Sequence, residues 1–579
     1  MERKDVEEKY KWDRTQIYSN EGLWEEDFKK LKEMTKEFKK YKGEFNESSL
    51  IECIKLLENT AILFDKLYVY SHMQLDENVG DSKSQALNSK ILGFHSEFAD
   101  EVSFITPQIL KTEGVEKFNL GNYSTYINNI LRYKEHTLSK VEESVLAQTS
   151  KISKAASHIF NMFDNADIKF NDVKDKDNKI LPLTNGTYSR YMQGADRVLR
   201  ENSFKSMYKS YSSMKNTLGQ MLIENTNKNV FYKKVKKYKS AREMSLFGDN
   251  VKEEVYDNLI KVTGQNLERL HEYYAYKKQV LGLDELHLYD TSAEIIKDER
   301  TYNYEEGRKI VEEALKVLGE DYSNNIERAF EERWIDVYET KGKRTGGYCT
   351  NAYEVHPYIL LNYNDTLSSV TTLAHELGHA MHSHYSNTNQ NYLNSEYTIF
   401  VAEVASTVNE ILVLEYLLGK TRDKNILLHE LDSIKSTFYR QTMFAEFEKI
   451  IHEEVENEKP ITVEDMCSIY YDLNKKYFGE SVVIDKEIEM EWSRIPHFYT
   501  SFYVYKYATG LASAYYIANE ILKGNEELKE RYLKFLKSGC TKYPLDLLRD
   551  VGVNLEETKS IQYVLDIFKT KLKEVVDGN

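Results

Sequence analysis

The chain has 579 residues, of which 41% are hydrophobic and 30% charged, and its formal net charge is −16. Such a length favours two or more domains, and no basic cluster is present that could follow a phosphate backbone. Binding to nucleic acid is therefore not expected, and no run of about 18 apolar residues predicts a membrane span.

Helix breakers are rare in this chain. Its 6 prolines leave the whole stretch between Pro182 and Pro357 without one, which favours a mainly helical protein. The four cysteines lie far apart, without the spacing of a metal site or of a disulfide framework. They predict free thiols, and the N-terminal residues lack the apolar core of a signal peptide, so we expect a cytoplasmic protein. The oligomeric state stays open.

The predicted elements follow one another as helices, a hairpin, helices, short strands and helices again. Residues 1–165 carry apolar side chains at spacings of three and four, typical of amphipathic helices. Two alternating runs around "KDKDN" predict a β-hairpin within 168–192. Three short strands are predicted between 333 and 364, directly before a helix rich in histidine. We expect a lobe boundary near 195, which separates an N-terminal helical lobe, 1–195, from a second domain, 196–579.

The stretch "LAHELGHAMH" places three of the 14 histidines of the chain within eight positions. On a helix over 367–385, four apolar residues share one face and three histidines share the opposite face. The apolar residues are Val370, Leu373, Leu377 and Met381, and the histidines are His375, His379 and His382. One face of this helix is therefore expected to be buried, and the histidines are directed together elsewhere.

His375 and His379 stand one helical turn apart, so two imidazole nitrogens can converge on one metal ion. Glu376 is near enough to reach a water on that ion without being a ligand. A solvated polar helix face is the plainer interpretation. The amphipathic phasing and the preceding strands favour the metal site.

A third protein ligand has to come from another element. Glu396, Glu403 and Glu410 follow at intervals of seven. Glu403 is the preferred candidate because apolar and small residues flank it, and a carboxylate is costly to bury there without a cation. Glu410 is either an acceptor for a ligand imidazole or an ordinary exposed glutamate. His382 is expected to form a hydrogen bond next to the site.

Several segments resemble the oligoendopeptidase F family, the bacterial branch of the thimet oligopeptidase superfamily of zinc peptidases. They are "AHELGHAMH", "FVAEVAS", "GKRTGGYC", "HPYILLNYND" and "IPHFYTSFYVYKYATG", and the resemblance covers nearly the whole chain. It implies a two-lobed helical zincin-type fold with a small sheet beside the active-site helix and a deep channel. It also implies one zinc ion per chain and cleavage of internal bonds in short, unstructured peptides.

The resemblance assigns roles residue by residue. The zinc ligands would be His375, His379 and Glu403, and the catalytic base would be Glu376. The segment after residue 494 would supply His497 and Tyr505, with Tyr503, to face the scissile carbonyl. Since the chain has 44 tyrosines, simple packing of these rings is the alternative.

The strands before the histidine helix have a predicted role in substrate binding. "YILLNYN" is interpreted as an edge strand along the cleft, to which an extended peptide could pair. "GKRTGG" would be the mobile turn that closes over this strand, and Tyr348 and His356 would line the same groove. A plain hairpin that supports the helix is the alternative.

Two other functions compete with that of an endopeptidase. A carboxypeptidase or dipeptidyl carboxypeptidase on the same helical fold would need a cationic anchor for the C-terminus of its substrate, and Arg494 is one candidate. A peptide-binding protein without catalysis is disfavoured because His375, Glu376, His379 and Glu403 are all present.

Overall fold

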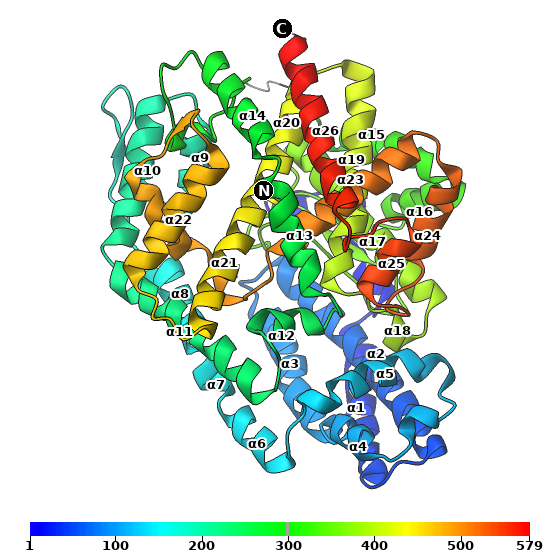
Figure 1. Cartoon of the computed structure of the whole chain (residues 1–579). Helices are drawn as coiled ribbons and strands as arrows, with labels where there is room; N and C mark the ends of the chain where they lie inside the picture. Colours follow the sequence, from blue (N-terminus) through cyan, green and yellow to red (C-terminus); the bar gives the residue numbers. More distant parts are fainter. Residues whose placement is uncertain (297–299, 579) are drawn as a thin grey trace. The chain divides into compact units, whose positions relative to one another are not determined.

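The computed structural model describes residues 1–296 and 300–578, and the chain forms two compact units (Figure 1). Unit 1 consists of Met1–Glu135, Arg300–Arg422 and Ala514–Val553, and unit 2 consists of His136–Glu299, Asp423–Ser513 and Asn554–Asn579. Both are mainly helical, as expected. The division differs from the expected boundary near residue 195, because residues distant along the chain share each core. Within the described residues, no helix has the length and apolar character needed to cross a membrane.

Unit 1 combines long helices with a three-stranded sheet. Its helices are α1 (Glu21–Lys36), α2 (Glu47–Glu77), α3 (Ser82–Val102), α4 (Ile105–Lys111), α5 (Ser124–Arg132), α15 (Tyr304–Leu315), α16 (Glu320–Glu331), α17 (Leu367–Asn389), α18 (Tyr392–Ser395), α19 (Ile399–Thr421), α24 (Glu526–Leu536) and α25 (Pro544–Asp550). Its strands are β4 (Ile335–Asp336), β5 (Tyr348–Thr350) and β6 (Tyr358–Leu360).

The sheet joins the N-terminal helices to the middle of the chain. Strand β6 lies between β4, to which it is parallel, and β5, to which it is antiparallel. Tyr358 and Leu360 of β6 belong to the same apolar core as Trp12 and Trp24 near the N-terminus. The predicted strands are confirmed, but "YILLNYN" forms the central strand. The edge strands are β4 and β5.

Unit 2 contains the remaining helices. They are α6 (Lys140–Gln148), α7 (Ser150–Ser153), α8 (Ala155–Met162), α9 (Asn185–Gln193), α10 (Arg197–Ser212), α11 (Lys215–Val235), α12 (Ala241–Phe247), α13 (Glu253–Gly264), α14 (Leu267–Val280), α20 (Lys424–Ile434), α21 (Arg440–Glu456), α22 (Val463–Phe478) and α26 (Thr558–Asp577). Helix α23 (Tyr505–Leu522) contributes residues to both units.

The predicted hairpin is confirmed in unit 2. Strands β1 (Val173–Lys174) and β2 (Ile180–Leu181) pair antiparallel around the "KDKDN" turn, in which Asn178 takes a positive φ of 60°. A second pair, β3 (Leu286–His287) and β7 (Val482–Val483), is parallel. These strands are short, so helix packing supplies most of the core.

Candidate active site

Helix α17 is built as the sequence predicts. The side chain of Thr366 caps its N-terminus by accepting a hydrogen bond from the Ser369 N–H. The four predicted apolar residues, Val370, Leu373, Leu377 and Met381, are all fully buried. Burial of this face on the rest of unit 1 leaves His375 and His379 directed into a cavity on the other side.

Helix α19 packs closely along α17, and Gly378 permits this approach. A Cβ atom on Gly378 would lie 2.5 Å from the Cα of Ser406 and 2.8 Å from the carbonyl oxygen of Ala405. Both of those atoms belong to the α19 backbone, which cannot move aside as a flexible side chain can. The glycine between the two histidines therefore sets how near α19, with Glu403, comes to them.

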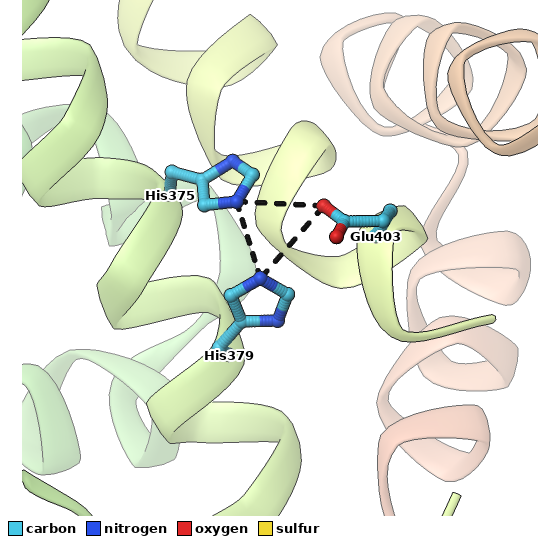
Figure 2. Close-up of side chains that lie close together, drawn as sticks. All are labelled: His375, His379 and Glu403. Atoms are coloured by element: carbon cyan, nitrogen blue, oxygen red, sulfur yellow. Dashed lines mark hydrogen bonds and ion pairs between the residues drawn. The ribbon is translucent and has the colours of Figure 1, made fainter. Parts of the chain in front are cut away.

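The side chains of His375, His379 and Glu403 point toward one another (Figure 2). The Nε2 atoms of His375 and His379 lie 3.1 Å apart. Oε2 of Glu403 lies 3.4 Å from Nε2 of His375 and 3.8 Å from Nε2 of His379. Tetrahedral zinc bound at about 2.1 Å separates its ligands by roughly 3.4 Å. The triangle has this size, and its two nitrogens and one carboxylate oxygen are a donor set that suits zinc.

Glu410, which lies about two helical turns after Glu403 on α19, orients His375. Its Oε1 lies 2.5 Å from His375 Nδ1. If Nδ1 carries the proton and donates it to the carboxylate, Nε2 has a free lone pair on the side of His379 and Glu403. The predicted contact of Glu410 with the His375 imidazole is present, and the role of that imidazole as a metal ligand stays a prediction. His382 differs, because it stacks on Tyr397 with ring centres 3.6 Å apart, and its Nδ1 has no hydrogen-bond partner among the described residues.

Burial and neighbouring charges shift the pKa values of His375, Glu376 and His379 in different directions. Burial alone would lower the pKa of His375, but the hydrogen bond and charge of Glu410 raise it to about 9. Burial and the neighbouring His375 lower the pKa of His379 to about 3. Burial raises the pKa of Glu376 to about 7. Proton-transfer groups often have such displaced values.

The cavity in front of the histidines has a volume of about 360 Å³. Besides the three candidate ligands and Glu376, it is lined by Gly347, Tyr348, Cys349, Asn351, Ser383, Tyr397 and Ala402. Tyr348 and Cys349 are the first two residues of β5, and Gly347 directly precedes the strand. The edge strand beside the candidate metal site is therefore β5, and not "YILLNYN" as predicted.

The residues predicted to line a groove separate into two groups. Tyr348 does line the cavity, and its hydroxyl donates a 2.6 Å hydrogen bond to the buried carboxylate of Asp76. His356 is not among the lining residues. Its ring stacks on Trp334 at 4.8 Å, and its Nδ1 lies 2.8 Å from the carbonyl oxygen of Pro357. We infer a packing role for His356.

The "GKRTGG" turn is anchored at its first half. The buried ammonium of Lys343 donates to the carbonyl oxygens of Tyr338 and Leu361, at 2.7 and 2.6 Å. The Nε of Arg344 donates a 2.6 Å hydrogen bond to Asp76. These bonds argue against a turn that swings as a whole over the site.

The predicted residues of the tyrosine segment all lie in unit 2. Tyr505 is fully buried, with its ring 5.2 Å from that of Tyr256. His497, Tyr503 and Tyr507 are half-buried and form an aromatic cluster. Nε2 of His497 lies 3.4 Å from the Tyr507 hydroxyl. Contact of any of them with a substrate stays a prediction.

Sequence reasoning missed three residues at or behind the cavity. Tyr397 follows the candidate Glu396 directly, so its position in the segment was a usable signal. Cys349 follows "GG" by two positions, and its spacing from the other cysteines predicts only a free thiol, which is confirmed. Asp76 carried no signal, because its partners Arg344 and Tyr348 lie about 270 positions away.

Two histidines and a glutamate that converge from adjacent helices, with a buried carboxylate beside them, define the class of metal-dependent peptidases. Comparison with known proteins narrows this class. Residues 190–567 match peptidase family M3, and residues 115–170 match the oligopeptidase F description. Oligopeptidase PepF of Bacillus subtilis is 40% identical over 99% of this chain and 88% of its own length. Group B oligopeptidase PepB of Streptococcus agalactiae is 37% identical, over 99% and 98%.

Solved structures agree with these relatives. A crystal structure of oligoendopeptidase-F from Enterococcus faecium is 31% identical with a TM-score of 0.74, covering 96% of this chain and 99% of that one. A structure from Chlamydophila abortus is 32% identical with a TM-score of 0.92, covering 100% and 99%. The chain belongs to peptidase family M3, in its oligoendopeptidase F group, and is a metallopeptidase.

Proposed function

We propose that the protein is a zinc-dependent endopeptidase that cleaves internal bonds of short, unstructured oligopeptides. The observation that carries this proposal is the triangle of donor atoms from His375, His379 and Glu403. Zinc held there would polarise the scissile carbonyl and acidify a water molecule. The names of the relatives, oligopeptidase and oligoendopeptidase, agree with this class of substrate.

Glu376 is the proposed general base. Its side chain is buried and lines the same cavity as the three candidate ligands, although it does not belong to their triangle. The absence of a Cβ on Gly347 keeps space open next to it, since such an atom would lie 3.5 Å from Glu376 Oε1. A carboxylate in this position can take a proton from the attacking water and deliver it to the leaving amine.

Strand β5 is the proposed binding edge for the substrate backbone. It pairs with β6 on one side, and its first residues line the cavity. An extended peptide that added to this edge would be held through main-chain hydrogen bonds, whatever its side chains are. This mode of binding fits an enzyme that accepts many short peptides and excludes folded chains, which offer no free strand.

The proposed donors to the developing oxyanion are His497 and Tyr507, with Tyr503 beside them. A donor has to reach the substrate, and these three side chains are half-buried whereas Tyr505 is fully buried. The proposal therefore moves the role predicted for Tyr505 to Tyr507. One such donor typically contributes a factor of about 10² to 10³ in turnover.

The decisive experiment combines Glu376→Gln with metal analysis and an internally quenched peptide whose C-terminus is amidated. The variant should retain wild-type zinc content and lose about 10²- to 10⁴-fold in turnover, because only the proton acceptor is missing. Wild-type enzyme should cut the amidated peptide, which a carboxypeptidase would not. His379→Ala serves as the contrast, since it should lose zinc together with activity. Retained zinc with wild-type turnover in Glu376→Gln would refute the assignment.

A further inference from the structure

Unit 2 contains a pocket of about 620 Å³, and His497 is the one lining residue to which the proposed function gives a role. Its walls come from α9, α10, α14, α20, α21 and α22 and from the segment that ends at His497. All of these elements belong to unit 2. Several aromatic rings line the walls, among them Tyr188, Phe204, Tyr208, Tyr274, Phe444 and Tyr477. A volume of this size is typical of a site for a small organic ligand.

Charged side chains line the same pocket, and most of them neutralise one another. Arg440 Nη2 lies 2.7 Å from Glu491 Oε1, and the other carboxylate oxygen of Glu491 accepts a 2.6 Å hydrogen bond from a tyrosine hydroxyl. Lys435 Nζ lies 2.5 Å from Asp432 Oδ1. Two cations are thus already matched by two carboxylates.

Arg494 is the third cation, and it shares the negative charge of Glu491 with Arg440. Among the residues that the structure describes, no carboxylate pairs with it, and its guanidinium lies over the Tyr188 ring at 4.9 Å. The ring holds the guanidinium by a cation–π contact, and the Tyr211 side chain takes part of its hydrogen-bonding edge. A guanidinium has five N–H donors, so the others are those that a planar anion would use. The pocket therefore has one surplus positive charge in an aromatic enclosure.

The backbone beside this pocket has a further unusual feature. Between α20 and α21 the chain forms a π-helical turn, Lys435–Tyr439. Such turns are rare and occur frequently at functional sites. This turn supplies Lys435, Ser436 and Tyr439 to the pocket wall.

We propose that this pocket binds a carboxylate of an oligopeptide, with Arg494 as the receptor and the aromatic walls around the adjoining side chain. A carboxylate is favoured over a phosphate because it carries a single negative charge, which one guanidinium can balance. The remaining cations are already paired, and a dianion would need them. The inference rests on the proposed function only for the peptide nature of the ligand. The carboxylate could be the C-terminus or an acidic side chain, and both present the same chemistry.

The test is a binding titration with the intact zinc-loaded protein. N-acetyl-Ala-Phe with a free C-terminus is compared with its C-terminal amide, and mass spectrometry verifies that each probe is recovered uncut. N-acetyl-Glu-Phe-amide and N-acetyl-Gln-Phe-amide form the second pair, which reports on a side-chain carboxylate. We expect at least one acidic probe to bind tenfold or more tightly than its neutral partner.

Variants then assign that preference to a residue. Arg494→Gln should remove the preference, and Arg494→Lys should retain part of it because the charge stays and the planar fork is lost. Lys435→Gln is the matched control in the same wall, and it should keep the preference because Lys435 is already paired. Equal binding of acid and neutral probes, or a preference that survives Arg494→Gln in a folded variant, would overturn the proposal.

These outcomes are independent of hydrolysis. If the protein cut no peptide at all, acid-selective binding through Arg494 would still establish the pocket. If it cut peptides without any acid preference, the proposed function would stand and the pocket proposal would fall.

Discussion

Gly378→Ala should weaken the packing that brings Glu403 to the histidines. The new Cβ atom would lie at 2.5, 2.8 and 2.9 Å from backbone atoms of Ser406 and Ala405. Ordinary contacts of this kind begin at about 3.4 Å, so α17 and α19 would have to separate by several tenths of an ångström or more. Because both helices are long and buried on their shared side, the strain cannot be relieved by one side chain.

The expected magnitude follows from two opposing effects. Overpacking of a well-packed core costs about 1–3 kcal/mol. Replacing glycine by alanine within a helix gains about 0.5–1 kcal/mol. A net loss of about 1–2 kcal/mol in the free energy of unfolding is expected, together with weaker zinc binding because Glu403 moves with α19.

Gly419→Ala is the matched control, because Gly419 is an exposed residue of α19 and its Cβ would meet nothing within 4 Å. It should stabilise the protein by about 0.5–1 kcal/mol and leave zinc affinity unchanged. Urea unfolding of the metal-free protein and zinc titration against a competing chelator measure both effects. A Gly378→Ala protein as stable as Gly419→Ala, with wild-type zinc affinity, would refute the reasoning.

Three further results are expected. Glu410→Ala should lower zinc affinity about 10- to 100-fold, because the His375 ring is then no longer held in place. Glu396→Ala changes an exposed residue and should leave zinc affinity unchanged. Equal affinities of the two variants in a chelator competition would contradict this prediction. Tyr507→Phe should lower kcat about 10²- to 10³-fold with little change in KM. Tyr505→Phe, at a buried ring, should leave kcat near wild type, and the reverse result would restore Tyr505 as the donor. Glu448 is fully buried, and burial raises its pKa from 4.5 to about 8. The folded state then keeps a proton that the unfolded chain releases, so stability should fall as pH rises from about 4.5 to 8. Glu448→Gln should flatten that slope in urea unfolding at several pH values, and an unchanged slope would count against the shift.

The metal half of the site was predictable because regular helices carry it. A period of 3.6 residues puts His375 and His379 on one side of α17 whatever the rest of the fold does. The same period brings Glu403 and Glu410, seven positions apart, to nearly the same face of α19. There Glu403 lies near Nε2 of His375 and Glu410 lies near Nδ1 of the same ring. Local phasing was sufficient here.

The sheet and the division into units were less accessible, because long-range contacts decide them. "YILLNYN" became the central strand only because β4, more than twenty residues earlier, pairs with its other side. The turn before β5 is held by Asp76 of α2. No local pattern in either segment predicts a strand or side-chain partner so far away along the chain.

The tyrosine segment shows where phasing arguments stop. Helix α23 begins only at Tyr505. Three residues earlier, Phe502 takes a positive φ of 60°, and its N–H donates a 3.0 Å hydrogen bond to the buried carboxyl group of Glu448. A helical period therefore cannot be extended back from α23 to His497. Within α23, residues two apart point about 200° apart, so Tyr505 and Tyr507 cannot share an environment. Which of them faces inward is decided by Tyr256 on α13, and that contact is absent from any local pattern. The choice between the two hydroxyls is thus a property of the packed unit, although the segment that carries them was recognisable from the sequence.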